Sequence, residues 1–146
     1  MADSVYLGNP NLKRANVSQE WTKKEVQEYA KCMNDPQYFI ENYIMIVSLD
    51  EGLVPFKMYD FQKEMVGTFH SNRFTICKLP RQSGKSTTII AYLLHYVLFN
   101  ASVNVAILAN KAATARDLLG RLQLAYEHLP KWLQQGVINW NKGNIE

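Results

Sequence analysis

A chain of 146 residues, 47% of them apolar and 20% charged, is long enough for one hydrophobic core and has an ordinary globular composition. Its net charge of +3 is too small to indicate nucleic-acid binding by itself. The N-terminus is polar, unlike a secretory signal, and the longest apolar run, residues 88–99, is too short to cross a bilayer, so we expect an intracellular protein. Cys32 and Cys77 lack metal-ligand spacing, and we expect two buried, reduced thiols.

The first part of the chain contains one clear helix signal. Residues 1–17 are polar and lack periodicity, and we interpret them as a flexible arm. Thr22 and Glu25 have the spacing of a capping box, which predicts a helix over residues 23–33.

A second helix and a possible strand follow. Asp35 is a good N-cap and Pro36 suits the first helical position, which predicts a helix over residues 36–43. The apolar, β-branched run 44–49 predicts a strand or a helix extension, and residues 50–52 predict a turn.

Strand-like and helix-like segments then alternate. The predicted elements are a helix over 59–70, a strand over 74–79, a helix over 85–100, a strand over 103–108, a helix over 112–129 and a short strand over 137–140. This alternation implies an α/β fold with a parallel sheet and crossover helices. Residues 141–143 predict a turn into a return strand, and we expect the chain to be part of a longer protein. We divide it into the arm 1–17, a helical part 18–58 and an incomplete core 59–146.

Between the first predicted strand of this core and its following helix lies the segment Leu79–Thr87, LPRQSGKST. A phosphate-binding P-loop has the same order of a strand, a Gly-Lys-Ser turn and a helix. This order predicts a P-loop NTPase-like sheet. Gly84 lets the backbone approach the phosphates, Lys85 would bridge the β- and γ-phosphates, and Ser86 would bind Mg²⁺. The expected phosphate-binding residues are Pro80, Arg81, Gln82, Ser83, Gly84, Lys85, Ser86 and Thr87. The alternative is an ordinary strand–turn–helix with a solvated lysine.

Two positions depart from the usual loop. The consensus places a glycine five residues before Gly84, where this chain has Leu79. Arg81 adds a second cation, which could neutralise charge developing on the γ-phosphate. A surface arginine paired with a carboxylate is the alternative, and both interpretations remain open.

The segment 80–86 resembles the deviant Walker A of the large terminase subunit of tailed bacteriophages, a DNA-packaging ATPase family in which the first glycine is commonly absent. Residues 58–62 resemble the adenine-recognising segment of this family, and residues 105–111 resemble the strand and helix that follow its Walker A. Residues 32–40 and 136–143 are similar to segments of the T-even type. The resemblance covers most of residues 20–146.

The resemblance implies ATP and Mg²⁺ as cofactors. Lys85 and Ser86 would hold phosphate and Mg²⁺, Arg81 would be a cis-acting arginine, and Gln62 would pair with the adenine edge. From the residues alone, a solvated glutamine remains the favoured alternative for Gln62. The implied partners are double-stranded DNA, the portal protein and the small terminase subunit, with a ring of full-length copies acting in the cytoplasm of the infected bacterium.

The carboxylates for hydrolysis are missing. ATP hydrolysis needs an acidic residue on Mg²⁺ and a group that orients water. After Lys85 the only acidic residues are Asp117, Glu127 and Glu146, and none follows an apolar strand as an Asp-Glu pair. The sheet is therefore expected to be incomplete, without its Walker B strand. We expect an ATPase in the full-length protein, with a nuclease in an absent C-terminal domain, and at most weak ATP binding without efficient hydrolysis by this chain.

Two other functions stay open. A superfamily 2 helicase motor shares an upstream glutamine and a Gly-Lys-Ser/Thr loop, but Arg81-Gln82 and the absent first glycine favour the terminase. The second open function is that of a non-catalytic interaction module with a vestigial nucleotide loop. Four basic residues could contact DNA, although a solvated helix face is the favoured interpretation: Lys111, Arg116, Arg121 and Lys131.

Overall fold

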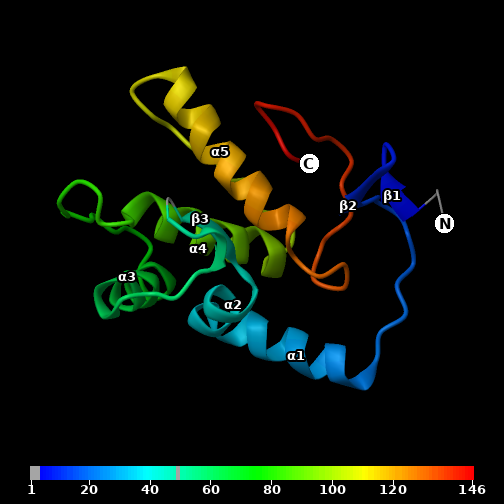
Figure 1. The fold of residues 1–146 in the computed structure, drawn as a ribbon. Coiled ribbons are helices and arrows are strands. Elements are labelled where there is room, and N and C mark those ends of the chain that lie inside the picture. The colour runs from blue at the N-terminus through cyan, green and yellow to red at the C-terminus, as the bar shows by residue number, and fades with distance from the viewer. Residues whose placement is uncertain (1–3, 49) are drawn as a thin grey trace.

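The computed structural model describes residues 4–48 and 50–146 (Figure 1). Its elements are β1 (Val5–Tyr6), β2 (Asn9–Lys13), α1 (Lys23–Asn34), α2 (Pro36–Tyr43), β3 (Met45–Ser48), β4 (Gly52–Pro55), α3 (Asp60–Ser71), α4 (Lys85–Phe99) and α5 (Ala112–Glu127). Within the described residues, the strands form two separate two-stranded antiparallel sheets. The fold is therefore mixed α and β, and its helices lie close to the predicted bounds.

The first two helices begin at the predicted caps. The Thr22 hydroxyl accepts from the Glu25 N–H at 3.2 Å, and the Glu25 carboxylate accepts from the Thr22 N–H at 2.8 Å, which completes the capping box of α1. The Asp35 carboxylate accepts from the Tyr38 N–H at 3.0 Å, and Pro36 occupies the first turn of α2. Both helix starts are confirmed, because their caps are local in sequence.

A hairpin follows α2. Strand β3 confirms the strand alternative for residues 44–49, although Leu49 lies outside the described residues. Met45 pairs with Pro55 and Ser48 with Gly52, whose φ of +73° lies in the left-handed region that favours glycine. Strand β4 was not predicted, so the part expected to be helical also contains this sheet.

The N-terminal segment is not the predicted flexible arm in the part that the structure describes. Strands β1 and β2 form a hairpin, and Leu12 is almost fully buried. The Val137 N–H donates to the Lys13 carbonyl at 2.8 Å, and the Lys13 N–H donates to Gln134 Oε1 at 3.0 Å. Partners more than 120 residues away hold this segment, which a pattern within the segment could not indicate.

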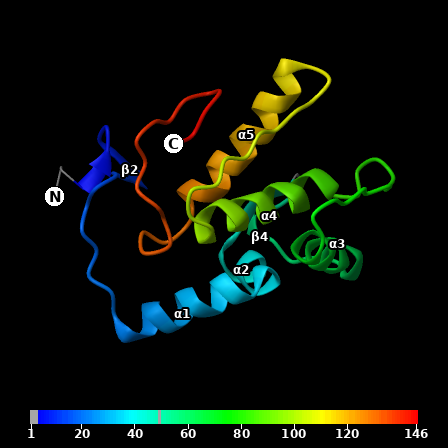
Figure 2. The same ribbon diagram turned by 180° about the vertical axis from the view of Figure 1, so that it is seen from behind.

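Helix α4 lies at the centre of the helical part, with α2, α3 and α5 packed around it (Figures 1 and 2). Its middle contributes Ile90, Ala91, Leu94 and Leu98 to the core. The other core side chains come from β2, the remaining helices and the connecting segments: Leu12, Cys32, Phe39, Ile40, Ile44, Phe56, Met58, Val66, Leu122, Ala125, Tyr126, Leu129, Leu133 and Val137. The broad apolar stripe predicted for this helix is confirmed.

The predicted parallel sheet is not present in the described residues. Residues 74–79 and 103–108 form no strand, and their backbone groups make no hydrogen bond to other backbone groups there. Ile76 is 97% exposed and Leu108 is 87% exposed. Parallel strands require neighbouring strands for their hydrogen bonds, and the described chain offers none to these segments.

The predicted strand over residues 137–140 is reduced to isolated bridges. Val137 pairs with Arg14 in parallel, and Trp140 pairs with Ile145 in antiparallel orientation. The turn between Trp140 and Ile145 is confirmed, since the Asn141 N–H donates to the Asn144 carbonyl at 3.0 Å.

Among the described residues, no helix is both long and apolar enough to span a membrane. Cys32 and Cys77 are free thiols. Cys32 is buried as predicted, whereas Cys77 is only half-buried.

His95 is a buried polar residue of α4. Its Nε2 lies 2.8 Å from the Cys32 carbonyl, and its ring packs against Phe39 and Phe99. Burial lowers the pKa of His95 from its ordinary value of 6.5, and this effect outweighs the contact with the Cys32 carbonyl, which raises the pKa. The native protein therefore keeps this ring neutral at a pH where the unfolded chain already binds a proton.

Truncation in the α4 core should be costly. Leu94→Ala removes a fully buried side chain and should lower the free energy of unfolding by about 2–5 kcal/mol. Urea denaturation measures this loss. Leu108→Ala is the matched control: its side chain is exposed, and the change should stay within about 0.5 kcal/mol. Equal losses at both positions would contradict the packing described here.

Acid should destabilise the protein through His95. Because its folded pKa is lowered, the unfolded chain binds the extra proton, and stability should fall as the pH decreases from about 7 to about 5.5. His95→Phe should flatten the pH dependence of the urea midpoint in this range. The same pH slope in the His95 variant and the parent would refute the assignment.

Candidate functional site

The predicted phosphate loop leads directly into α4. Gly84 is the N-cap residue of α4 and has a φ of +72°, in the left-handed region. Gln82 also has a positive φ, of +61°. Glycine adopts this region at little cost, whereas other residues adopt it with strain. The turn into α4 therefore needs a residue without a Cβ at position 84.

The start of α4 has unpaired backbone donors. No side chain caps this helix, and within the described part of the chain the N–H groups of Lys85, Ser86 and Thr87 donate to no backbone carbonyl. The first intrahelical bond runs from the Thr88 N–H to the Gly84 carbonyl at 3.0 Å. Free N–H groups and the helix dipole favour an anion at this position.

The loop is closed by its own polar groups. The Ser83 hydroxyl and the Lys85 ammonium both donate to the Pro80 carbonyl, each at 3.0 Å. These two bonds draw the first residue of the loop towards the start of α4. The Lys85 ammonium thus lies over the loop.

Neither cation of the loop is neutralised. Among the described residues, Arg81 and Lys85 have no carboxylate within ion-pair distance. Arg81 is exposed, and the alternative of an arginine paired with a nearby carboxylate is therefore not found in this structure. Two positive charges next to free helix N–H groups make this end of α4 electropositive.

Gln62 lies against the loop. Its side chain is 2% exposed, so it is not the solvated glutamine of the alternative interpretation. Its Oε1 accepts from the Tyr59 N–H at 2.9 Å, and its Nε2 donates to the Ser83 carbonyl at 3.4 Å. The fold therefore brings together Gln62 and the loop, which are separated by a helix in the sequence.

A groove of about 830 Å³ borders the loop. Its walls come from the β3–β4 hairpin, the start of α3 and the loop: Ile46, Ser48, Glu51, Val54, Pro55, Phe56, Lys57, Tyr59, Phe61, Gln62, Gln82, Ser83, Gly84 and Thr87. Tyr59 is 71% exposed, and its ring stacks on Phe61 with centroids 5.9 Å apart and an interplanar angle of 10°. Phe61 is 37% exposed and lines this groove together with Tyr59.

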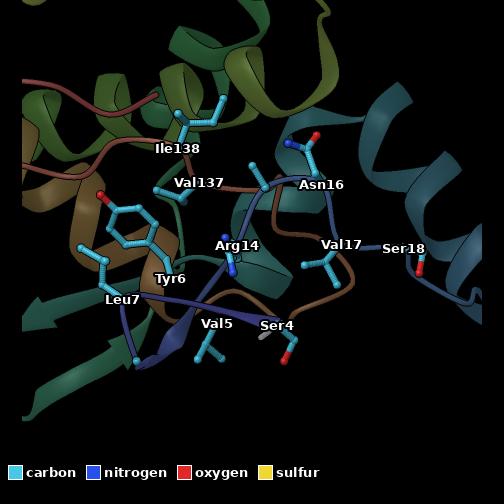
Figure 3. A pocket seen from close by; sticks show the side chains of 12 residues that line it. Ser4, Val5, Tyr6, Leu7, Arg14, Asn16, Val17, Ser18, Val137 and Ile138 are labelled. Carbon is cyan, nitrogen blue, oxygen red and sulfur yellow. The ribbon is translucent and has the colours of Figure 1, made fainter. Parts of the chain in front are cut away.

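A second cavity lies at the N-terminal hairpin (Figure 3). Its volume is about 990 Å³, and Arg14 is the only charged residue among those that line it. It contains no residue of the phosphate loop and no acid, histidine or cysteine. Among the residues that line it, the hydroxyl groups therefore have no histidine, lysine or carboxylate that could activate them as nucleophiles.

The described residues contain no group of three or more His, Cys, Asp or Glu side chains that could hold a metal ion. Asp117 pairs with Arg121 one turn along α5 at 3.0 Å, in a solvent-exposed ion pair. At the loop, Ser86 is the predicted Mg²⁺ ligand, and one hydroxyl is a poor site for a free ion that prefers several oxygen ligands. The donor set fits a triphosphate with its own Mg²⁺ better than Mg²⁺ alone.

Replacement of Gly84 should destabilise the protein. In Gly84→Ala, the new Cβ would lie 2.6 Å from Gln62 Nε2 at a positive φ, so we expect a loss of about 1–2 kcal/mol or more in the free energy of unfolding. Gly120→Ala is the matched control, because α5 leaves open space there, and it should stabilise by up to about 1 kcal/mol. Urea denaturation measures both. A neutral Gly84→Ala would contradict the loop geometry.

Residues 76–146 match the protein family described as "Terminase large subunit, T4likevirus-type, N-terminal". The matched region contains the loop, α4 and α5, and it begins within the segment that precedes the loop. This match supports the expectation that the chain is an N-terminal fragment of a T4-like terminase large subunit, and with it a role in phage DNA packaging.

Proposed function

We propose that residues 80–87 bind the triphosphate of ATP together with Mg²⁺, in a motor that moves double-stranded DNA into a procapsid. The observation that carries the proposal is the start of α4. There, within the described residues, the N–H groups that follow Gly84 donate to no backbone carbonyl, and the cations Arg81 and Lys85 have no carboxylate partner. This combination of a turn, amide donors and positive charge is suited to phosphate oxygens.

Each loop residue has a distinct proposed task. Lys85 exchanges its contact with the Pro80 carbonyl for the β- and γ-phosphates, a charge-assisted and therefore stronger interaction. The Ser86 hydroxyl would hold the Mg²⁺ of the bound nucleotide. Arg81 is exposed and would neutralise charge at the γ-phosphate. Mg²⁺ supplies further neutralisation of phosphate charge when it is bound.

The adjoining groove is the proposed place for the nucleoside. The stacked rings of Tyr59 and Phe61 provide an apolar wall, and an exposed aromatic face suits a nucleobase. Gln62, Gly84 and Thr87 line the same groove, which makes it continuous with the loop.

We further propose that residues 74–79 and 103–108 become strands of a parallel sheet when neighbouring strands are supplied. Phe74, Ile76, Val105 and Leu108 in these segments are exposed. Within the described residues their backbone groups pair with no other backbone group, as for a sheet edge that lacks a neighbour. In the full enzyme, such strands would also carry the carboxylates for hydrolysis. The proposed partners of the full enzyme are double-stranded DNA, the portal protein and the small terminase subunit. The chain described here would bind ATP without hydrolysing it efficiently.

Thermal unfolding tests the nucleotide site. The midpoint of the 146-residue chain should rise with the concentration of ATP·Mg²⁺, with about 2.7 kcal/mol of stabilisation at 100 times the dissociation constant. Lys85→Ala should remove most of this rise, because it removes a cation at the phosphates. Lys111→Ala, a lysine that precedes α5, is the matched control and should retain the rise.

Two results would contradict the proposal. No stabilisation of the parent chain at millimolar ATP·Mg²⁺ would favour an interaction module with a vestigial loop. Steady-state phosphate release by the parent chain that is lost in Lys85→Ala would show that the chain hydrolyses ATP, and would disprove the proposed need for added carboxylates.

A further inference from the structure

Residues 74–79 present an open strand edge between α3 and α4. Phe74 is 83% exposed and Ile76 is 97% exposed, whereas Thr75 and Cys77 between and after them are half-buried. This alternation is the period of a β-strand. The segment projects beyond both helices (Figures 1 and 2), and within the described residues its backbone groups pair with no other backbone group. Such an edge is a template for a strand of another chain.

The chain also has more surface than a compact protein of its size. Its accessible surface is 10028 Å², whereas a compact monomer of 16.8 kDa is expected to have about 7,700 Å². The surplus of about 2,300 Å² is larger than the about 800 Å² that each partner buries in a standard protein interface. The chain therefore has enough surface for a stable dimer without the opening of any helix.

Thr75 gives a second, independent observation. Its hydroxyl oxygen is buried and has no hydrogen-bond partner within the described residues. Buried polar groups without a partner are rare in folded proteins. In an antiparallel strand pair, two threonines that lie directly opposite each other can form a hydrogen bond. A second copy of the same segment, centred on Thr75, would supply this partner.

We propose that two copies of this chain form a dimer in which residues 73–77 pair with the same residues of the partner copy, antiparallel and about a two-fold axis at Thr75. Closed two-fold dimers are the commonest assemblies of identical chains. In this register Phe74 of each copy lies opposite Ile76 of the other, and aromatic and β-branched side chains form favourable cross-strand pairs. The dimer goes beyond the proposed function and does not depend on the phosphate site.

The charges that flank the segment favour this register. Arg73 and Lys78 have no carboxylate within ion-pair distance in the described part of the chain. With the axis at Thr75, the two Arg73 side chains are offset by about 13 Å along the strands, which exceeds the screening length at physiological salt. An axis at Cys77 would instead place the two Lys78 residues diagonally opposite, about 7–8 Å apart. Repulsion therefore disfavours that alternative.

Sedimentation equilibrium with complementary variants tests the dimer. The parent chain should show a monomer–dimer equilibrium. Phe74→Lys and Ile76→Glu each disrupt both apolar pairs, and each should raise the dissociation constant of the dimer about ten-fold or more. A mixture of the two variants should restore a heterodimer. In that heterodimer the introduced ammonium and carboxylate face each other in one pair, and the other pair keeps its native side chains.

Leu108→Lys is the matched control. Leu108 is 87% exposed but lies outside the segment, so this variant should keep the dissociation constant of the parent. An equal loss of dimer in Leu108→Lys would indicate unspecific apolar association and would overturn the inference, as would a mixture that stays monomeric. A parent chain that remains monomeric at millimolar concentration would also overturn it, and would leave the strands proposed for the full enzyme as the partner of this edge.

Cysteine cross-linking tests the register. Thr75→Cys places two thiols opposite each other, where paired strands bring Cα atoms to about 4.5–5.5 Å, a separation that a disulfide can bridge. Oxidation by air and copper should therefore give a covalent dimer of this variant. The parent chain should stay uncross-linked, because Cys77 is offset by four residues from its copy in this register and Cys32 is buried. Cross-linking of the parent chain but not of Thr75→Cys would overturn pairing about Thr75.

Discussion

Burial of α4 determines the geometry of the candidate site, because the same helix carries the phosphate loop at its N-terminus. Its middle packs against α2, α3 and α5, where Ile90, Leu94 and Leu98 are buried. Burying side chains of this size stabilises the fold by about 1.5–3 kcal/mol each. The hydrophobic core therefore sets the direction of the free N–H groups. The loop only has to lead the chain into α4, a helix that the core already holds in place.

The loop itself combines strain, closure and unbalanced charge. Gly84 and Gln82 have positive φ angles, and the Pro80 carbonyl accepts from Ser83 and Lys85. Two cations remain without a carboxylate in the described part of the chain. Mutual repulsion of exposed charges is small in water, but it favours an anion as the next binding partner.

The loop is held chiefly from its helical side. In a doubly wound sheet a strand would support it from the other side, whereas here residues 74–79 carry exposed apolar side chains and unpaired backbone. The contact from Gln62 and the core packing of α4 replace that support. The same exposed segments are a predicted aggregation hazard, since apolar extended chain with free N–H and C=O groups readily pairs with other chains.

The amino-acid sequence alone determined the features that depend on near neighbours. The caps at Thr22 and Asp35, the apolar stripe of α4 and the Gly-Lys-Ser turn all act within a few residues, so pattern and spacing predicted them. The same reasoning failed for residues 74–79 and 103–108, because a strand exists only where another strand completes its hydrogen bonds. Tertiary structure also decided the burial of Leu12, whose neighbour Lys13 contacts Gln134, and the burial of Gln62, which contacts Ser83. Local hydrogen bonds can be identified from the chain itself, whereas contacts between distant segments form only when the whole core closes.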